Sequence, residues 1–392
     1  MTSTGAGATT TSVGDLVDKR RVIICCGTGG VGKTTTAAVI ALEGARRGRN
    51  ACVVTIDPAR RLADALGIAH LGNDATEIDR KLWAADSDGD AGSVAGGRLS
   101  ALMLDTKSTF DVLVSRNASS PEQAQRILDN TFYRNVSGAL GGTQEYMAME
   151  KLHELYDEGD FDLIVVDTPP TRHALDFLDA PKRLTRLLDN RVFRLLMMPT
   201  RAYLRVASVA VQTFLRTVAR GVGSEVIEDV VAFFRSFEGM EEGFRERAQV
   251  VGDLLTHSDT AFVLVTSPRR DAMQEATFFA ERLAAANQSV QALVVNRVHP
   301  SFGDESPEGL RAAADTLRQT PSDAATRLAA LYDNLADFRQ IAGLERAHIE
   351  ELRARIGGRT AVAYVPYLPH DVHDFETLHE VGRLLFATVS GR

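Results

Sequence analysis

The sequence predicts an α/β fold with a doubly wound, mainly parallel sheet, and three observations support this. Short apolar runs typical of buried strands alternate with helical patterns along the chain. The runs are apolar almost throughout, as in strands that helices cover on both faces. Polar residues or prolines follow these runs, at the sheet edge where ligands bind in such folds. The predicted strands span 21–26, 51–56, 101–104, 161–166, 260–266, 290–295 and 361–365.

Composition narrows the class of protein. The 392 residues suffice for one large domain or two smaller ones, and the formal net charge of -8 argues against nucleic acid as a partner. The three cysteines, Cys25, Cys26 and Cys52, fall in predicted strands and form no C-x-x-C pair. We therefore expect buried thiols rather than a disulfide or a structural zinc site.

The N-terminal 19 residues are rich in Thr, Ser, Gly and Ala, and we predict that they form a disordered tail. They lack the apolar core of a signal peptide. No apolar span reaches the ~20 residues that cross a bilayer. The sequence thus favours a cytoplasmic protein with at most peripheral membrane contact.

The segment from Gly27 to Thr35 matches the phosphate-binding pattern G-x-x-x-x-G-K-[ST]. It lies between the strand at 21–26 and a predicted helix at 36–47, which is the order that a phosphate-binding P-loop requires. Backbone N–H groups and the helix N-terminus would bind phosphate oxygens there. ATP and Mg²⁺ are the predicted ligands, with Lys33 on the β- and γ-phosphates and the Thr34 hydroxyl on the metal. The predicted nucleotide-binding residues of the loop are Gly29, Gly30, Val31, Gly32, Lys33, Thr34 and Thr35.

Two aspartates follow predicted strands. Asp167 ends an apolar strand, which is the arrangement that holds Mg²⁺ directly or through water. Residues 168–175 after it would form a constrained loop that senses the γ-phosphate. Asp57 follows the second strand, where a carboxylate can orient the attacking water. Each aspartate has an ordinary alternative role, as a helix cap or a turn residue.

Three motifs together resemble those of the arsenical-pump and tail-anchored-protein-targeting ATPases, a family in the deviant P-loop class that also contains MinD. They are the loop at 27–35, Asp57-Pro-Ala followed by Asp64, and Asp167-Thr followed by Pro-Thr and His173. Asn296 and the Pro366 segment resemble the adenine-side elements of that family. The resemblance covers residues 20–390 in a single copy.

This resemblance implies a P-loop ATPase domain over 20–392, with a helical subdomain at about 110–156 and 189–250. It also implies a dimer that clamps ATP between two facing P-loops. Asp57 would position the hydrolytic water and act with Lys33 in catalysis, and the segments around Asp57 and Asp167 would be nucleotide-sensing switches.

The chain departs from the family at Thr28, where the family has a signature lysine that reaches the partner subunit's phosphates. We expect pairing with a homologous subunit that supplies this lysine, giving a heterodimer. A homodimer with slow hydrolysis, or with Arg60 or Arg61 as a substitute cation, remains the alternative. Arg172, where the family usually has glycine before His173, is a second departure.

Residues 190–224 combine six arginines with many apolar residues and no acidic residue. Such a segment suits amphipathic clients, although ordinary helix packing explains the same composition. The resemblance places the hydrophobic client groove here, which favours a targeting factor or chaperone for hydrophobic helices of membrane proteins. The alternative is a weakly hydrolysing regulatory subunit. An arsenite pump is disfavoured because the cysteines lie outside the helical region.

Overall fold

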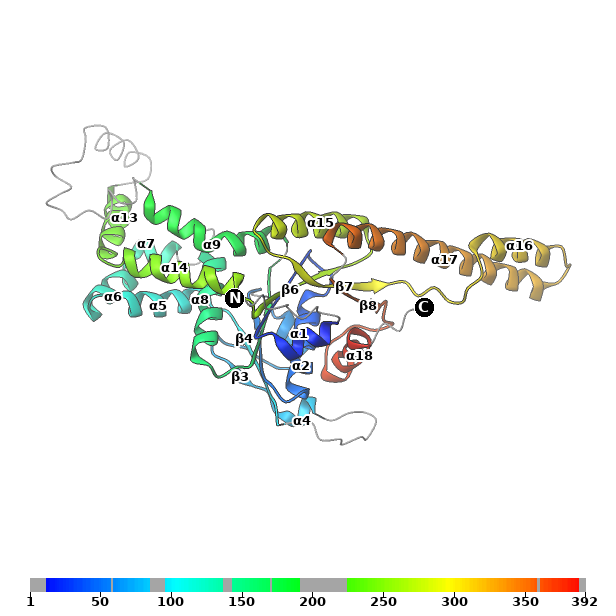
Figure 1. Ribbon diagram of the computed structural model, residues 1–392, viewed down its shortest axis with the longest axis horizontal. Helices are drawn as coiled ribbons and strands as arrows, with labels where there is room; N and C mark the ends of the chain where they lie inside the picture. The colour runs from blue at the N-terminus through cyan, green and yellow to red at the C-terminus, as the bar shows by residue number, and fades with distance from the viewer. Residues whose placement is uncertain are drawn as a thin grey trace, which may run out of the picture.

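The computed structural model describes residues 12–57, 59–84, 96–136, 143–169, 171–190, 224–357 and 360–387, and it contains one eight-stranded sheet between layers of helices (Figure 1). The strand order is β3-β4-β2-β5-β1-β6-β7-β8. All neighbours pair in parallel except β3 with β4. The predicted α/β fold class is therefore confirmed. The strands are β1 (Val22–Gly27), β2 (Asn50–Thr55), β3 (Thr76–Glu77), β4 (Arg98–Met103), β5 (Leu163–Asp167), β6 (Thr260–Thr266), β7 (Val290–Val298) and β8 (Ala361–Pro366).

Strands β1, β5 and β6 at the centre of the sheet are buried along their whole length. Their β-branched and apolar residues fit a pleated surface that is covered on both faces. β1 is flanked by β5 on one side and β6 on the other, so the winding direction reverses there. Its carboxyl end is therefore the switch point at which such folds bind ligands.

One face of the sheet packs against the N- and C-terminal helices. Ile23, Cys25 and Val53 point into this layer. The covering helices are α1 (Val13–Lys19), α2 (Lys33–Arg46), α3 (Arg61–Ala65), α4 (Arg80–Trp83) and α18 (Phe375–Phe386).

Helix α1 contradicts part of the predicted disordered tail. Ser12 caps the helix by accepting a hydrogen bond from the Asp15 N–H, and Leu16 and Val17 are fully buried. The prediction over 1–19 is wrong for residues 13–19, because tertiary burial orders a helix too short to be stable alone. Residues 1–11 lie outside the described part of the chain.

The other face of the sheet packs against a larger set of helices. Ile24, Cys26 and Val54 point into this layer. The helices that contribute to it include α8 (Thr143–Glu158), α9 (Thr171–Asp189), α14 (Glu241–Thr256) and α15 (Arg270–Ala285).

Helices gather at one end of the sheet and form a lobe, at the left of Figure 1. The lobe comprises α5 (Thr106–Asn117), α6 (Pro121–Leu128), α7 (Thr131–Val136), α13 (Ser224–Ser236) and parts of α8, α9 and α14. Phe233 stacks on Tyr133 with ring centroids 5.9 Å apart, so α13 packs on α7. The predicted subdomain at 110–156 and 189–250 overlaps these helices, but its boundary stays a prediction and residues 191–223 lie outside the described residues.

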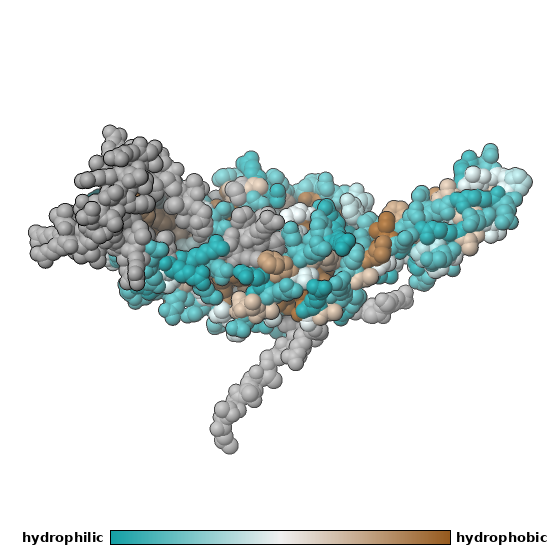
Figure 2. Space-filling model, turned by 90° about the horizontal axis from the view of Figure 1, so that it is seen from above, coloured by the Kyte–Doolittle hydropathy of each residue, from teal (hydrophilic) through white to brown (hydrophobic). Residues whose placement is uncertain are grey.

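A long helical arm projects from the opposite end of the molecule, at the right of Figure 1. Helix α17 (Asp323–Ile356) has 34 residues, and α16 (Pro307–Arg318) packs along its outer half. Ile349 and Leu352 anchor its inner half in the core. Apolar residues are visible on the surface where the arm joins the body (Figure 2). Within the described residues, no helix combines the length and apolar character needed to span a membrane.

Candidate nucleotide-binding site

The phosphate-binding loop leaves β1 through a close backbone contact. Gly27 has a φ of 152°, and a Cβ atom built there would lie 2.0 Å from the carbonyl oxygen of Val265 in β6. Only glycine fits this position, because the neighbouring atom belongs to backbone. The loop thus starts directly after β1, at the centre of the sheet.

Gly32, near the C-terminal end of the loop, lies in close contact with Asn296. Gly32 adopts a φ of 94°, and a Cβ there would lie 2.3 Å from Nδ2 of Asn296. That nitrogen donates a 2.8 Å hydrogen bond to the carbonyl of Val31. Asn296 therefore lies beside the loop and supports its backbone. Its contact with adenine stays a prediction.

Lys33 is the first residue of α2 and is buried. Its Nζ donates a 2.7 Å hydrogen bond to the carbonyl of Thr28, so the side chain folds back over the loop. Burial lowers the pKa of Lys33, whereas the charge of Asp167 raises it. A phosphate in the loop would supply the anion that this ammonium group needs.

Asp167 lies at the end of β5 and is 1% exposed. Its Oδ2 accepts hydrogen bonds from Thr34 Oγ1 at 2.7 Å and Thr55 Oγ1 at 3.0 Å. Its Oδ1 is buried and has no hydrogen-bond partner among the described residues. Burial raises the pKa of Asp167 to about 6, although the Thr34 hydrogen bond and the charge of Lys33 both lower it.

These oxygens fit Mg²⁺. The cation prefers carboxylate and hydroxyl oxygens and usually keeps several waters, so a complete protein cage is not required. The unpaired Oδ1 of Asp167 and the hydroxyl of Thr34 are donors of this kind, next to the loop that would bind phosphate. No group of three or more His, Cys, Asp or Glu side chains in the described residues suggests a different metal centre.

Asp57 lies just beyond β2, next to β5 in the sheet. Its Oδ1 accepts a 2.9 Å hydrogen bond from the Ala59 N–H, and its Oδ2 lies 3.4 Å from Nη1 of Arg61. The Asp57 carboxylate therefore stabilises the turn and also forms an ion pair. It is 21% exposed and accessible to water.

The side chain of Thr28 is 6% exposed, and its hydroxyl has no hydrogen-bond partner among the described residues. It packs inward, so this position presents no charge at the surface of the loop in this conformation.

A cleft of about 350 Å³ opens beside the loop. It is lined by Thr28, Gly29, Gly30, Val31, Ser267, Pro268, Arg269, Asp271, Ala272, Glu275, Arg297, His299, Glu345 and Tyr367. The His299 ring stacks on Tyr367 with centroids 5.7 Å apart. Pro366 ends β8 but does not line the cleft, whereas its neighbour Tyr367 does. Sequence reasoning missed His299, which follows β7, and Glu345, which only the fold brings to this edge on α17.

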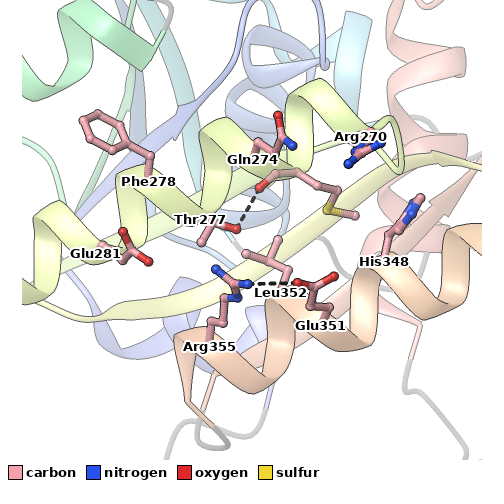
Figure 3. A pocket seen from close by; sticks show the side chains of 10 residues that line it. Arg270, Gln274, Thr277, Phe278, Glu281, His348, Glu351, Leu352 and Arg355 are labelled. Atoms are coloured by element: carbon pink, nitrogen blue, oxygen red, sulfur yellow. Dashed lines mark hydrogen bonds and ion pairs between the residues drawn. The ribbon is translucent and has the colours of Figure 1, made fainter.

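A second cavity of about 440 Å³ lies between α15 and α17 (Figure 3). Its charged groups bond locally, as Arg355 does with Glu351 at 2.9 Å, and Phe278 is half exposed at its rim. It contains none of the phosphate-binding residues, so we do not assign the nucleotide to it.

The segment after Asp167 differs from its prediction. A loop was expected over 168–175, but α9 begins at Thr171 and the backbone from there is helical. The Thr168 hydroxyl donates to the carbonyl of Cys25 over 2.8 Å, which ties the start of this segment to β1. The side chains of Arg172 and His173 are outside the described set.

Gln144 connects the site with the helical lobe and was not predicted. Its Nε2 donates a 2.9 Å hydrogen bond to the carbonyl of Ile56, the residue before Asp57. Gln144 lies in the first turn of α8, whose Glu150 pairs with Arg247 of α14 at 2.7 Å. The sequence does not indicate this contact, because nothing in it distinguishes Gln144 from other polar residues on a helix.

Comparison with known proteins gives a consistent result. The family model described as anion-transporting ATPase matches residues 20–341. The ATPase GET3 of Malassezia globosa is 29% identical over 191 residues, which cover 46% of this chain and 51% of that protein. The ATPase GET3 of Phaeosphaeria nodorum is 24% identical over 280 residues, or 71% of this chain and 76% of that protein. A third relative, ATPase get3 of Aspergillus terreus, is 28% identical over 169 residues, or 43% and 45%. The chain thus spans about half the length of the first and third of these relatives.

Proposed function

Because the chain belongs to the anion-transporting ATPase family, we propose that it binds ATP with Mg²⁺ at the loop Gly27–Thr35 and hydrolyses it. The observation that supports this best is the contact between two distant motifs. The Thr34 hydroxyl lies 2.7 Å from Asp167, and the other oxygen of Asp167 is buried with no hydrogen-bond partner among the described residues. A metal-nucleotide complex would satisfy that oxygen.

The chain's own residues have distinct tasks in the proposed reaction. Lys33 exchanges the Thr28 carbonyl for phosphate oxygens, and the loop N–H groups orient the triphosphate. Asp57 accepts a hydrogen bond from the attacking water and aligns it with the γ-phosphorus. Mg²⁺, held by Thr34 and by Asp167 directly or through water, would neutralise charge on the β- and γ-phosphate oxygens.

ATP is proposed to drive opening and closing of a dimer that binds hydrophobic helices of membrane-protein clients. Three relatives of this chain bear the name ATPase GET3 or get3. The resemblance of its motifs to those of the tail-anchored-protein-targeting ATPases supports the assignment. In the sequence, α9 precedes residues 191–223 and α13 follows them, and both helices contribute to the lobe. The working compartment in this proposal is the cytoplasm.

The dimer partner is proposed to be a homologous subunit. Thr28 leaves this chain without a cation to extend toward a partner's phosphates. A paralogue that bears lysine at this position would complete the nucleotide site of this chain.

A weakly hydrolysing regulatory subunit is the second candidate, and Thr28 is the observation that favours it. An arsenite-binding role has less support. Such chemistry needs thiolates gathered at one accessible site, whereas Cys25, Cys26 and Cys52 are all buried and unpaired. Burial also raises the pKa of each thiol.

Calorimetric titration with Mg-ATP tests the nucleotide site. Lys33→Ala is expected to weaken ATP binding by about 100-fold or more, since it removes the buried cation that contacts phosphate. Lys107→Ala removes an exposed lysine that pairs with Asp111 and lies over the Tyr133 ring, and it serves as the control. Equal ATP affinity in both variants would refute the site.

Native purification followed by mass spectrometry tests the partner and the client. A stoichiometric paralogue together with apolar membrane-protein segments supports a targeting factor. A paralogue without such segments supports the regulatory alternative. Faster hydrolysis by Thr28→Lys alone would indicate that the missing lysine limits the isolated chain.

A further inference from the structure

Among the described residues, Arg61 is a cation that contacts Asp57, a residue of the proposed catalytic set. Arg61, the first residue of α3, has its Nη1 atom 3.4 Å from Oδ2 of Asp57. Asp57 is the carboxylate proposed to orient water. The guanidinium therefore lies beside the place where the γ-phosphoryl group reacts.

The neighbouring arginine is directed elsewhere. Arg60 donates from Nη2 to the carbonyl of Ala69 at 3.0 Å, which holds its charge at the far end of this short segment. Sequence alone offered Arg60 and Arg61 as equal candidates for a cation. The contacts of the described residues distinguish them.

Arg61 is loosely held. Its side chain is 63% exposed, and an exposed ion pair of this kind contributes only about 0–1 kcal/mol to stability. It can therefore leave Asp57 for a stronger anion at little cost. A γ-phosphate carries more charge than a carboxylate and matches the planar, two-pronged guanidinium.

The charge of Arg61 also acts on Lys33 of the loop. Burial lowers the pKa of Lys33, and the charge of Arg61 lowers it further. The positive charges of Arg61 and Lys33 therefore lie close enough to repel each other. A triphosphate bound in the loop would attract both charges.

We propose that Arg61 is a catalytic residue that contacts the γ-phosphoryl group of ATP within its own subunit. The inference rests on the proposed ATPase function and adds a residue to it.

The reaction in this proposal is hydrolysis. A water oxygen bonds to the γ-phosphorus, and the bond from phosphorus to the β–γ bridging oxygen breaks. ADP and inorganic phosphate leave, with one water proton kept on phosphate and the other released to solvent through Asp57. Arg61 stays protonated and donates hydrogen bonds to the equatorial oxygens, whose charge it balances in the transition state.

The test compares Arg61→Ala with Arg60→Ala in the full-length chain. Single-turnover hydrolysis by Arg61→Ala is expected to fall by about 100-fold or more, as for other arginines that act on a transferring phosphoryl group. Arg60→Ala should stay within about threefold of the unaltered chain, because its guanidinium contacts only a loop carbonyl. Arg61→Lys should recover part of the rate, since it restores charge without the two-pronged geometry.

Calorimetry gives a readout that does not depend on turnover. Arg61→Ala should lose about tenfold of the preference for ATP over ADP while its ADP affinity is unchanged, because the contact is to the γ-phosphate alone. Thermal melting checks that both variants fold.

The outcomes separate the two proposals. If the unaltered chain and Lys33→Ala bind ATP equally, the nucleotide site itself fails, and the role of Arg61 fails with it. If the unaltered chain binds ATP but Arg61→Ala matches Arg60→Ala in the ATP-to-ADP preference, only the role of Arg61 is overturned. A loss of that preference confined to Arg61→Ala, together with the loss of rate, supports it.

Discussion

The hydroxyl of Thr34 donates a 2.7 Å hydrogen bond to Oδ2 of Asp167, 133 residues further along the chain. Thr34 is the second residue of α2, the helix after the phosphate loop, and Asp167 ends β5. Strands β1 and β5 are direct neighbours, with Cys25 opposite Asp167 in the register. The pairing of these two strands therefore brings together the two side chains that are proposed to hold Mg²⁺.

Asp167→Asn should stabilise the ligand-free protein while removing its response to Mg²⁺. Burial raises the pKa of Asp167 from 3.8 to about 6, so the ionised form is unfavourable by up to about 3 kcal/mol at neutral pH. Asparagine carries no charge and still offers an oxygen to Thr34 and Thr55. Urea denaturation at pH 7.5 measures the change, with the exposed Asp74→Asn as the control. A less stable Asp167→Asn protein would contradict the expectation.

The same carboxyl predicts a dependence on pH. Its pKa in the folded state lies above its ordinary value, so the folded state binds this proton more tightly than the unfolded chain does. The free energy of unfolding should therefore fall, through this group, as the pH rises from about 4 to about 6. Mg²⁺ needs the ionised form, so Mg-dependent ATP affinity should rise between pH 5 and 7. Calorimetry at several pH values checks this, and Asp167→Asn should remove the dependence.

Gly32→Ala and Gly30→Ala should differ in cost. Both residues have positive φ, of 94° and 75°, so both substitutions strain the backbone by about 1 kcal/mol. A Cβ at Gly32 would also lie 2.3 Å from Nδ2 of Asn296, whereas one at Gly30 meets nothing within 4 Å. We expect Gly32→Ala to lower the free energy of unfolding by about 1–3 kcal/mol more. Equal denaturation midpoints would contradict this expectation, because they would mean that the Asn296 side chain moves aside at no cost in free energy.

Leu16→Ala tests whether α1 is part of the folded core. Leu16 is fully buried against the helices on that face, so its truncation should cost about 2–5 kcal/mol. Lys19→Ala, in the same helix but half exposed, should change stability by less than about 1 kcal/mol. The comparison is made by thermal or urea unfolding. A disordered N-terminal segment would leave both variants equal to the parent.

Much of the site could be predicted because its residues follow strands or belong to one contiguous motif. The loop, Asp57 and Asp167 all have this property. Thr55 could not be predicted, because its role depends on β2 lying beside β5, with Thr55 opposite Asp167. Strand order is a property of the whole fold, and a single sequence does not report it.

Two elements escaped prediction for different reasons. Helix α1 has seven residues in a polar region, and only its burial against α2 and α18 stabilises it. The arm at 307–356 lies between two predicted strands, and its exposed apolar residues obscure the helical pattern. These are Leu328, Leu331, Phe338, Ile341 and Leu344.

Helix α17 connects the cleft beside the loop with the outer end of the arm. Glu345 borders the cleft, while the helix begins 22 residues earlier, at Asp323. At 1.5 Å per residue that distance is about 33 Å, so a tilt of about 5° at Glu345 would displace the tip by roughly 3 Å. A small tilt of α17 beside the cleft would thus produce a larger displacement at the outer end of the arm.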